Sequence, residues 1–252
     1  MTDKITETTE PKPRKRNPKA TETEAALPPA RWRLWVKWAL RGLGIVAGGF
    51  ALTILLFSCV PPPINAYQLS EVWRLDGIEK DWVDWDEMAP VMGRSAVAAE
   101  DANFCNHWGF DMAAIRLAIE EGSNRGASTI SQQVVKNVFL WQGRSYVRKA
   151  MEAILTPVVE LVWSKQRILE VYLNVAEFDE GVFGVQAAAQ HYFGVNAKDL
   201  SALQAARLAA VLPDPKGRSA AKPSSFVRQR TRAIMSGADT IAADGRSACF
   251  GG

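Results

Sequence analysis

The sequence contains few residues that could form disulfides or hold a metal. Its 252 residues include three cysteines, Cys59, Cys105 and Cys249, and two histidines, His107 and His191. These residues stand far apart without paired spacing, which argues against a disulfide framework and against a zinc site. We therefore expect the cysteines to serve as small apolar packing groups.

The charge of the chain is also nearly balanced. With 30 Lys and Arg against 27 Asp and Glu, the net charge is +3, which is too small to indicate a nucleic-acid-binding protein. Strand-like alternation is scarce, and no internal repeat is visible. Because 48% of the residues are hydrophobic, the chain can bury the core of one sizeable domain with appendages, or of two small domains.

One long apolar run stands near the N-terminus. Residues 42–60, GLGIVAGGFALTILLFSCV, contain no charged side chain and have roughly the length that a helix needs to cross a bilayer. The three prolines at 61–63 should end that helix. A cleaved signal peptide would need a shorter charged region before it, and a buried core helix fits poorly with the prolines. We therefore favour an uncleaved transmembrane anchor.

Basic residues are concentrated before this run. They include Lys12, Arg14, Lys15, Arg16, Lys19, Arg31, Arg33, Lys37 and Arg41. After the run, the first basic residue is Arg74. The positive-inside rule therefore predicts a cytoplasmic N-terminus, with everything after Pro63 on the outer side of the membrane.

These features divide the chain into five expected segments. They are a disordered basic cytoplasmic tail, a transmembrane helix, a linker, a folded domain and a C-terminal tail, at residues 1–38, 39–60, 61–92, 93–233 and 234–252. Residues 1–30 are rich in Thr, Glu, Lys and Pro and lack hydrophobic periodicity. After Pro223 most residues are small or polar, and we expect that part to be loosely held.

Helical spacing dominates the folded domain. Apolar side chains recur at steps of three and four residues in one long run, at Val147, Ala150, Met151, Ile154, Leu155, Val158 and Val162. Pro157 predicts a kink there, or a division into two helices. Residues 168–175 and 203–212 show the same spacing. The domain is therefore predicted to be mainly α-helical.

The first polar motif is EDANFCNHWG, which begins with Glu100 and Asp101. An acidic pair followed by an aromatic residue, a histidine and a glycine is a weak signal by itself. Such a pair is usually a solvated helix end, and a single histidine is more often a hydrogen-bonded core residue than a catalyst.

The second motif, GASTISQQVVKN, begins at Gly126. Its glycine and hydroxyl residues are typical of a loop that leads into a helix N-terminus, where hydroxyls and free amides can hold an anion. Gln132 and Gln133 lie four and three residues before Lys136, so the three share one helical face. That face suits sugar hydroxyls and phosphate, although a solvent-facing stripe has the same pattern.

The third motif is RKAME, in which Arg148 and Glu152 stand one helical turn apart with Lys149 beside them. An ordinary ion pair between residues four apart explains this spacing equally well.

Together these segments resemble the peptidoglycan glycosyltransferases of family 51, which include the polymerase half of bifunctional penicillin-binding proteins. Between Ala96 and Pro215 the blocks follow the family's order: EDANFCNHWG, GASTISQQVVKN, RKAME, KQRILEVYLN and GVQAAAQHYFG with LAAVLP. The short chain with one anchor is most similar to the monofunctional members. The resemblance implies a mainly α, lysozyme-like helical glycosyltransferase domain preceded by a single transmembrane helix.

The same resemblance implies a reaction and its partners. The enzyme would polymerise lipid II into glycan strands, with release of polyprenyl pyrophosphate, on the periplasmic side of the inner membrane. Implied partners are lipid II, the growing glycan on its polyprenyl pyrophosphate, the membrane, and cell-wall or division proteins, with no nucleic acid. No cofactor requirement is evident, and a divalent cation that bridges pyrophosphate and carboxylates is left open.

Carried onto matching positions, the resemblance assigns roles to individual residues. Glu100 would be the general base and Glu152 the second essential carboxylate. The basic positions for pyrophosphate are Lys136, Arg148 and Lys149. The expected substrate or supporting contacts are Asp101, Ser128, Thr129, Gln132, Gln133 and Asn137.

Two other segments are expected to support the site. The block KQRILEVYLN reads as scaffold, in which Glu170 and Asn174 make internal hydrogen bonds. Val138, Phe139, Leu140 and Trp141 follow the second motif directly, and we hypothesise that they form an apolar lip that dips into the membrane.

Three rival functions are weighed against this one. A lysozyme-like hydrolase also uses acidic catalysts, but it has no need of the basic cluster. A penicillin-binding acyltransferase is suggested only by Ser219 and Lys222, which satisfy S-x-x-K without its partner motifs. An anchored scaffold without activity leaves the ordered blocks unexplained.

Overall fold

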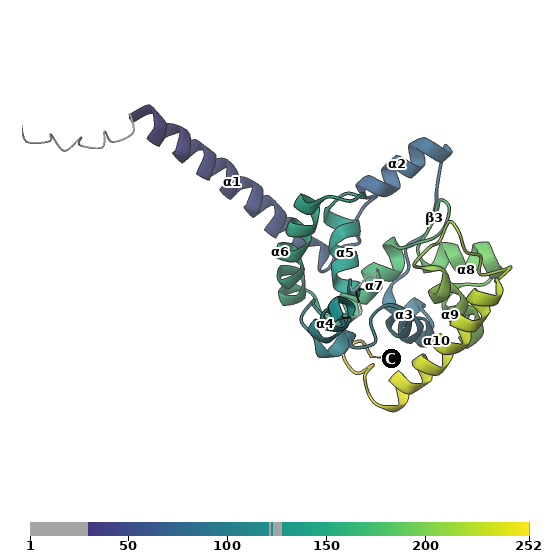
Figure 1. Ribbon diagram of the computed structural model, residues 1–252. Coiled ribbons are helices and arrows are strands. Elements are labelled where there is room, and N and C mark those ends of the chain that lie inside the picture. The colour runs from purple at the N-terminus through teal and green to yellow at the C-terminus, as the bar shows by residue number, and fades with distance from the viewer. Residues whose placement is uncertain (1–29, 121, 123–127, 252) are drawn as a thin grey trace, which may run out of the picture. The chain divides into compact units, whose positions relative to one another are not determined.

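The computed structural model describes residues 30–120, 122 and 128–251, with the backbone alone for residues 30 and 31 (Figure 1). The predictions for the tail at residues 1–29 and for the loop at Gly126 lie outside the described residues. Among the described residues, 30–48 and those from Gly49 onward belong to separate units.

The predicted N-terminal apolar helix is present as α1 (Ala30–Phe57). Its part from Trp32 to Phe57 is long and apolar enough to cross a membrane. The helix begins at Ala30 rather than at residue 39, so it includes part of the predicted tail. Residues 30–38, ARWRLWVKW, contain no Gly or Pro that would break a helix, which explains the earlier start.

The unit from Gly49 onward is mainly helical, as predicted. After α1, its elements in chain order are α2 (Ala66–Leu75), β1 (Glu79–Lys80), η1 (Trp85–Glu87), α3 (Pro90–Glu100), η2 (Phe104–Asn106), α4 (Met112–Glu120), α5 (Ile130–Phe139), α6 (Tyr146–Val162), α7 (Lys165–Val175), β2 (Glu177–Asp179), β3 (Val182–Phe183), α8 (Val185–Phe193), η3 (Ala197–Asp199), α9 (Ala202–Val211) and α10 (Ser225–Ala243). The three short strands form one sheet in the order β1-β3-β2, with β3 parallel to β1 and antiparallel to β2.

Helix α7 lies in the core of this unit and packs against α5. Every residue from Ile168 to Val175 is buried. Asn174 is fully buried, accepts a hydrogen bond from Val83 N at 3.0 Å and donates one to Val83 O at 2.9 Å. Glu170 accepts from Trp85 N at 3.0 Å. The prediction that this block is scaffold is therefore confirmed.

Helix α6 continues through Pro157 as one helix, so the predicted alternative of two helices is wrong. The proline ring removes one backbone donor. The helix continues because tertiary packing holds it on both sides of the proline. Glu152 and Thr156 are buried before Pro157, and Val159 and Glu160 are buried after it.

The C-terminal part is not loosely held, and that prediction is wrong. Helix α10 extends past the expected domain end at residue 233 and packs on α3 and α9, as Figure 1 shows for the yellow helix. Val227, Thr231, Ile234, Ala238 and Ile241 are buried on it. They recur at steps of three and four residues, a signal that the surrounding polar residues obscured.

The expectation that no disulfide forms is also wrong. Cys105 and Cys249 are joined in a disulfide across a sequence separation of 144 residues. No local spacing reveals such a pair, because the fold brings the two segments together. Cys59 is a free, exposed cysteine.

Candidate active site

The first motif places Glu100 at the C-terminal end of α3. Its side chain is largely buried, with 13% of its area exposed. Gln133 Nε2 donates a hydrogen bond to Glu100 Oε2 at 3.0 Å, and an Arg230 nitrogen lies 3.7 Å from Glu100 Oε1. The pKa of Glu100 is raised because burial disfavours the charged form. The hydrogen bond from Gln133 and the positive charges of Arg230 and Arg218 oppose this rise in pKa, whereas the charge of neighbouring Asp101 adds to it.

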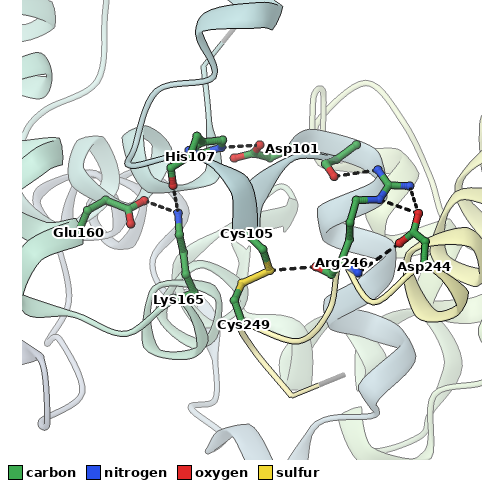
Figure 2. The surroundings of a disulfide bond; sticks show 9 residues. Asp101, Cys105, His107, Glu160, Lys165, Asp244, Arg246 and Cys249 are labelled. Atoms are coloured by element: carbon green, nitrogen blue, oxygen red, sulfur yellow. Dashed lines mark hydrogen bonds and ion pairs between the residues drawn. A yellow bond between two sulfur atoms is a disulfide. The ribbon is translucent and has the colours of Figure 1, made fainter.

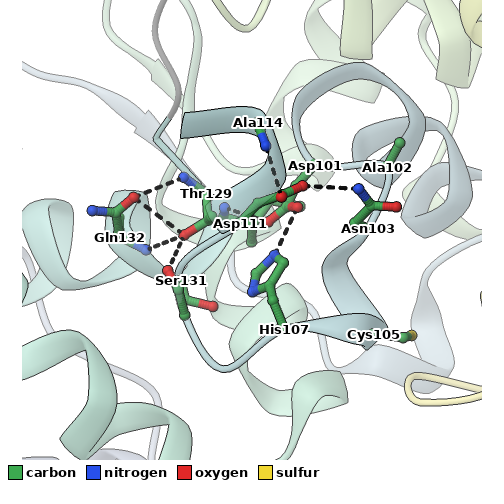
Figure 3. Close-up of polar contacts among 12 residues, drawn as sticks. Asp101, Ala102, Asn103, Cys105, His107, Asp111, Ala114, Thr129, Ser131 and Gln132 are labelled. Carbon is green, nitrogen blue, oxygen red and sulfur yellow. Dashed lines mark hydrogen bonds and ion pairs between the residues drawn. The ribbon is translucent and has the colours of Figure 1, made fainter. Parts of the chain in front are cut away.

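Both carboxylate oxygens of Asp101 are used inside the protein (Figure 3). Its Oδ2 accepts a hydrogen bond from Ile130 N at 3.0 Å, and its Oδ1 lies 2.9 Å from His107 Nε2. A carboxylate at the first amide of α5 also meets the positive end of that helix dipole. Asp101 therefore fixes the turn after α3 against α5. His107, to which the sequence analysis gave no role, belongs to this arrangement.

Thr129 and Gln132 form a reciprocal cap at the start of α5. The Thr129 side chain accepts from Gln132 N, and Thr129 N donates to Gln132 Oε1 at 3.1 Å. Thr129 Oγ1 also donates to Gly109 O at 2.7 Å. Capping boxes satisfy the free amides of a helix N-terminus. The Thr129 hydroxyl and the Gln132 Oε1 are thus engaged in the helix cap, as Figure 3 shows, while the Gln132 side chain also lines the cavity at the cation cluster.

A cluster of cations lies between α5 and α6. Arg148 donates to Glu152 Oε2 at 2.9 Å, and Lys149 forms an ion pair with Glu152 Oε1. Lys149 Nζ also donates to Ser128 Oγ at 3.4 Å. Glu152 is only 2% exposed, so a buried carboxylate holds two cations side by side. The third cation, Lys136, comes from the facing helix and lines the same cavity of about 150 Å³.

Lys136 is the least compensated of these cations. No carboxylate among the described residues lies within ion-pair distance of it. Its pKa is lowered, chiefly by burial and then by Arg148 and Lys149, while Glu152 and Glu100 act in the opposite direction. Glu152 therefore pairs with two of the three cations and leaves Lys136 without a paired carboxylate in the described part of the chain. The resulting excess of positive charge suits a pyrophosphate.

Three cavities lie along residues 128–137, from the residues that precede α5 to its last turns, and neighbouring cavities share lining residues. Ser128 lines both the cavity of about 250 Å³ beside Glu100 and the cavity at the cation cluster. Gln133 and Lys136 line both the cation cavity and a third cavity of about 370 Å³. Asn137 also lines this third cavity. Glu100 and the cations therefore line adjoining spaces along one helix.

The structure revises two details of the expected site. Arg230, which lies in none of the sequence motifs, proves to be a partner of Glu100. The expected apolar lip is wrong for Leu140, which is buried, while Val138 and Phe139 are half-buried against the core and Trp141 is exposed. The described residues contain no group of three or more His, Cys, Asp or Glu that could hold a metal ion.

Comparison with known proteins places these features in a family. The family described as Transglycosylase matches residues 68–239, a range that contains all the blocks on which the resemblance rests. A biosynthetic peptidoglycan transglycosylase of Jannaschia sp. (strain CCS1) is 59% identical over 214 residues, which cover 85% of this chain and 90% of that protein. Proteins of the same description from Pseudomonas fluorescens (strain SBW25) and Cronobacter sakazakii are each 50% identical, over 77% and 78% of this chain and 85% and 86% of their own lengths.

The match covers more than half of the chain, and the fold is mainly helical as that resemblance implies. The chain therefore belongs to the transglycosylase family and is a peptidoglycan glycosyltransferase, an enzyme that polymerises the glycan strands of peptidoglycan.

Proposed function

We propose that Glu100 is the general base of this polymerisation and that the cation cluster, Lys136, Arg148 and Lys149, receives the leaving pyrophosphate. The observation that carries this proposal is the arrangement along α5. A buried carboxylate with a raised pKa stands at one end, and an excess of positive charge stands in the adjoining cavity. The substrate would be lipid II, whose sugar and pyrophosphate match these two environments.

The chemistry requires these two environments together. Glu100 takes the proton from the 4-hydroxyl of the acceptor sugar, and the oxygen attacks C1 of the donor sugar. The bond from C1 to the pyrophosphate oxygen breaks on the opposite face, and its electron pair leaves with the pyrophosphate. A base works best when its pKa lies near the working pH, and burial moves the pKa of Glu100 in that direction. The cations stabilise the negative charge that develops on the leaving group.

Glu152 has a different role in this proposal. Its two oxygens are occupied by Arg148 and Lys149, so it is poorly placed to take a proton from the acceptor. It holds the two cations against their mutual repulsion. Gln133, which donates to Glu100 and lines the cation cavity, orients the base and spans the two environments.

Replacing Arg230 by Met should shift the pH dependence of polymerisation. Glu100 must be ionised to act as a base, so the rate increases as the pH rises through its pKa. Arg230 favours the ionised form, and its loss should raise the pKa of Glu100 further. The acid limb of the kcat profile should move to higher pH, whatever the height of its plateau.

The matched control for this measurement is Arg232→Met, because Arg232 is an exposed arginine two residues further along the same helix. Its profile should coincide with that of the wild type. An unchanged profile for Arg230→Met, or an equal shift for both variants, would argue against the assignment of Glu100.

The domain after Pro63 lies outside the cytoplasm in this proposal, with α1 as a single membrane anchor. The basic residues before the apolar run support this orientation, as does the Cys105–Cys249 disulfide, because disulfides persist in oxidising compartments. The thiol state of both cysteines in intact cells tests it, since a cytoplasmic domain would keep them reduced.

A further inference from the structure

The turn that carries the proposed base is held from behind by the C-terminal segment. We call residues 99–105 the catalytic turn, because Glu100 and Asp101 lie on it. We call Arg246, Cys249 and Phe250 the C-terminal clamp. Each of these three residues contacts the turn or the core directly beneath it, as Figure 2 shows for Arg246 and Cys249.

The first contact supplies a hydrogen bond to a backbone carbonyl of the turn. Arg246 donates to Ala102 O at 3.1 Å, one residue after Asp101. Asp244 Oδ2 accepts a hydrogen bond from Arg246 Nε at 2.8 Å, and Arg246 Nη2 lies 2.8 Å from the same oxygen. These two contacts fix the orientation of the guanidinium. Asp244 therefore holds the Arg246 guanidinium in the orientation that contacts the turn (Figure 2).

The second contact is covalent. Cys249 is joined to Cys105, which lies in η2 at the end of the turn. Two residues further on, His107 makes the bond to Asp101 and is itself held by Lys165, whose Nζ donates to His107 O at 2.7 Å. The disulfide therefore ties the C-terminal clamp to the same short stretch that positions Asp101 (Figure 2).

The third contact is apolar. Phe250 is 1% exposed, with its ring 6.1 Å from that of Trp85 and 6.3 Å from that of Phe104. A residue near the chain end is usually frayed, whereas this one is part of the core under the turn. Helix α10 completes the support through Arg230, which donates to Ala99 O at 3.1 Å. That carbonyl belongs to the last turn of α3, where backbone carbonyl groups have no amide donor from within the helix.

We propose that the C-terminal clamp positions the catalytic turn for polymerisation and that the Cys105–Cys249 disulfide locks it in place. Arg246 and Cys249 are positioning residues, since they act through the turn. The proposal rests on the proposed function, because positioning matters only if Glu100 is the base. A disulfide that served stability alone would constrain the unfolded chain and would leave turnover by the folded enzyme unchanged.

The test compares full-length enzyme in detergent with Cys105→Ser, Cys249→Ser and the double variant, using fluorescent lipid II as substrate. Cys59→Ser is the matched control, because Cys59 is free. All assays are run well below the melting temperature of every variant. We expect a loss of roughly 5- to 50-fold in kcat for the disulfide-free variants, in the range that small displacements of catalytic groups cause, with KM changed by less than about twofold. Cys59→Ser should match the wild type.

Reduction of the folded wild type gives a second measurement that does not depend on a variant folding. A water-soluble phosphine attacks one sulfur and breaks the S–S bond. One water molecule then supplies the oxygen of the phosphine oxide and the two protons that convert both sulfurs to thiols. Cys105 and Cys249 are both partly exposed, so the reagent can reach them. The kcat of the wild type should fall to that of Cys249→Ser, and reoxidation with oxidised glutathione should restore it. The double variant should not respond.

Two results would overturn the proposal. One is an unchanged kcat in the disulfide-free variants or in the reduced wild type. The other is a loss of kcat that is not specific to the disulfide. Such a loss would parallel the decrease in melting temperature among the variants, or the phosphine would cause it in the double variant as well. If Glu100→Gln is inactive while Cys249→Ser is fully active, only the clamp proposal fails. If Glu100→Gln retains activity, the proposed function fails, whatever the cysteine variants do.

Discussion

Replacing Glu100 by Gln is expected to lower kcat for glycan polymerisation by about 10²- to 10⁴-fold, the usual contribution of a general base, with little change in KM. Glutamine keeps the size of the side chain and can still accept the hydrogen bond that Gln133 donates to Glu100. It cannot take the proton of the acceptor hydroxyl at any working pH. The reaction would then depend on water as the base.

The rate of polymer formation from fluorescent lipid II, measured at several substrate concentrations, separates the two kinetic constants. Glu87→Gln is a suitable control, because Glu87 is exposed and pairs only with exposed Lys198 among the described residues. Its rate should equal that of the wild type. If Glu100→Gln kept a tenth or more of the wild-type kcat, another group would have to be the base.

Replacing Glu152 by Gln is expected to damage both activity and stability. Arg148 and Lys149 would lose the buried carboxylate that holds them side by side, and their repulsion would displace the groups that receive the pyrophosphate. A displacement of this kind costs on the order of 10²-fold in kcat. Removing one partner of a buried ion pair is strongly destabilising, but Lys149 is half-exposed and water can screen it, so we expect a loss of roughly 1–3 kcal/mol in unfolding free energy.

Glu71→Gln provides the matched control for this prediction. Glu71 is also buried and pairs with two cations, Arg74 and Lys216, neither of which belongs to the cation cluster. Urea unfolding should show a loss of stability for both variants, whereas kcat should fall steeply only for Glu152→Gln. A parallel loss of kcat in both would mean that Glu152 acts through stability alone.

The parts of the site that lie on one helix could be predicted from the sequence. Arg148 and Glu152 are four residues apart on α6, and they form the predicted ion pair at 2.9 Å. Gln133 and Lys136 share a face of α5 and line the same cavities. Spacing along a helix determines which side chains share a face, so a local pattern is sufficient for these contacts.

The contacts between distant segments could not be predicted in the same way. Asp101 bonds to Ile130 N and Glu100 meets Arg230 because separate helices pack together. The partner of Cys105 lies 144 residues away, and scattered cysteines without paired spacing gave no sign of it. Helix α10 was missed since polar residues surround its apolar stripe. Tertiary packing decides such contacts, and spacing along the chain carries little information about it.

The division of work between Glu100 and the cation cluster is tested most directly by counting products. Detergent-purified enzyme is incubated with fluorescent lipid II, and both the glycan ladder and the polyprenyl pyrophosphate are quantified over time, with Glu100→Gln and Glu152→Gln in parallel. The account predicts a ladder that lysozyme digests, one pyrophosphate released for each new linkage, and little of either from the two variants. Pyrophosphate release without a ladder, or shortening of added glycan, would contradict it.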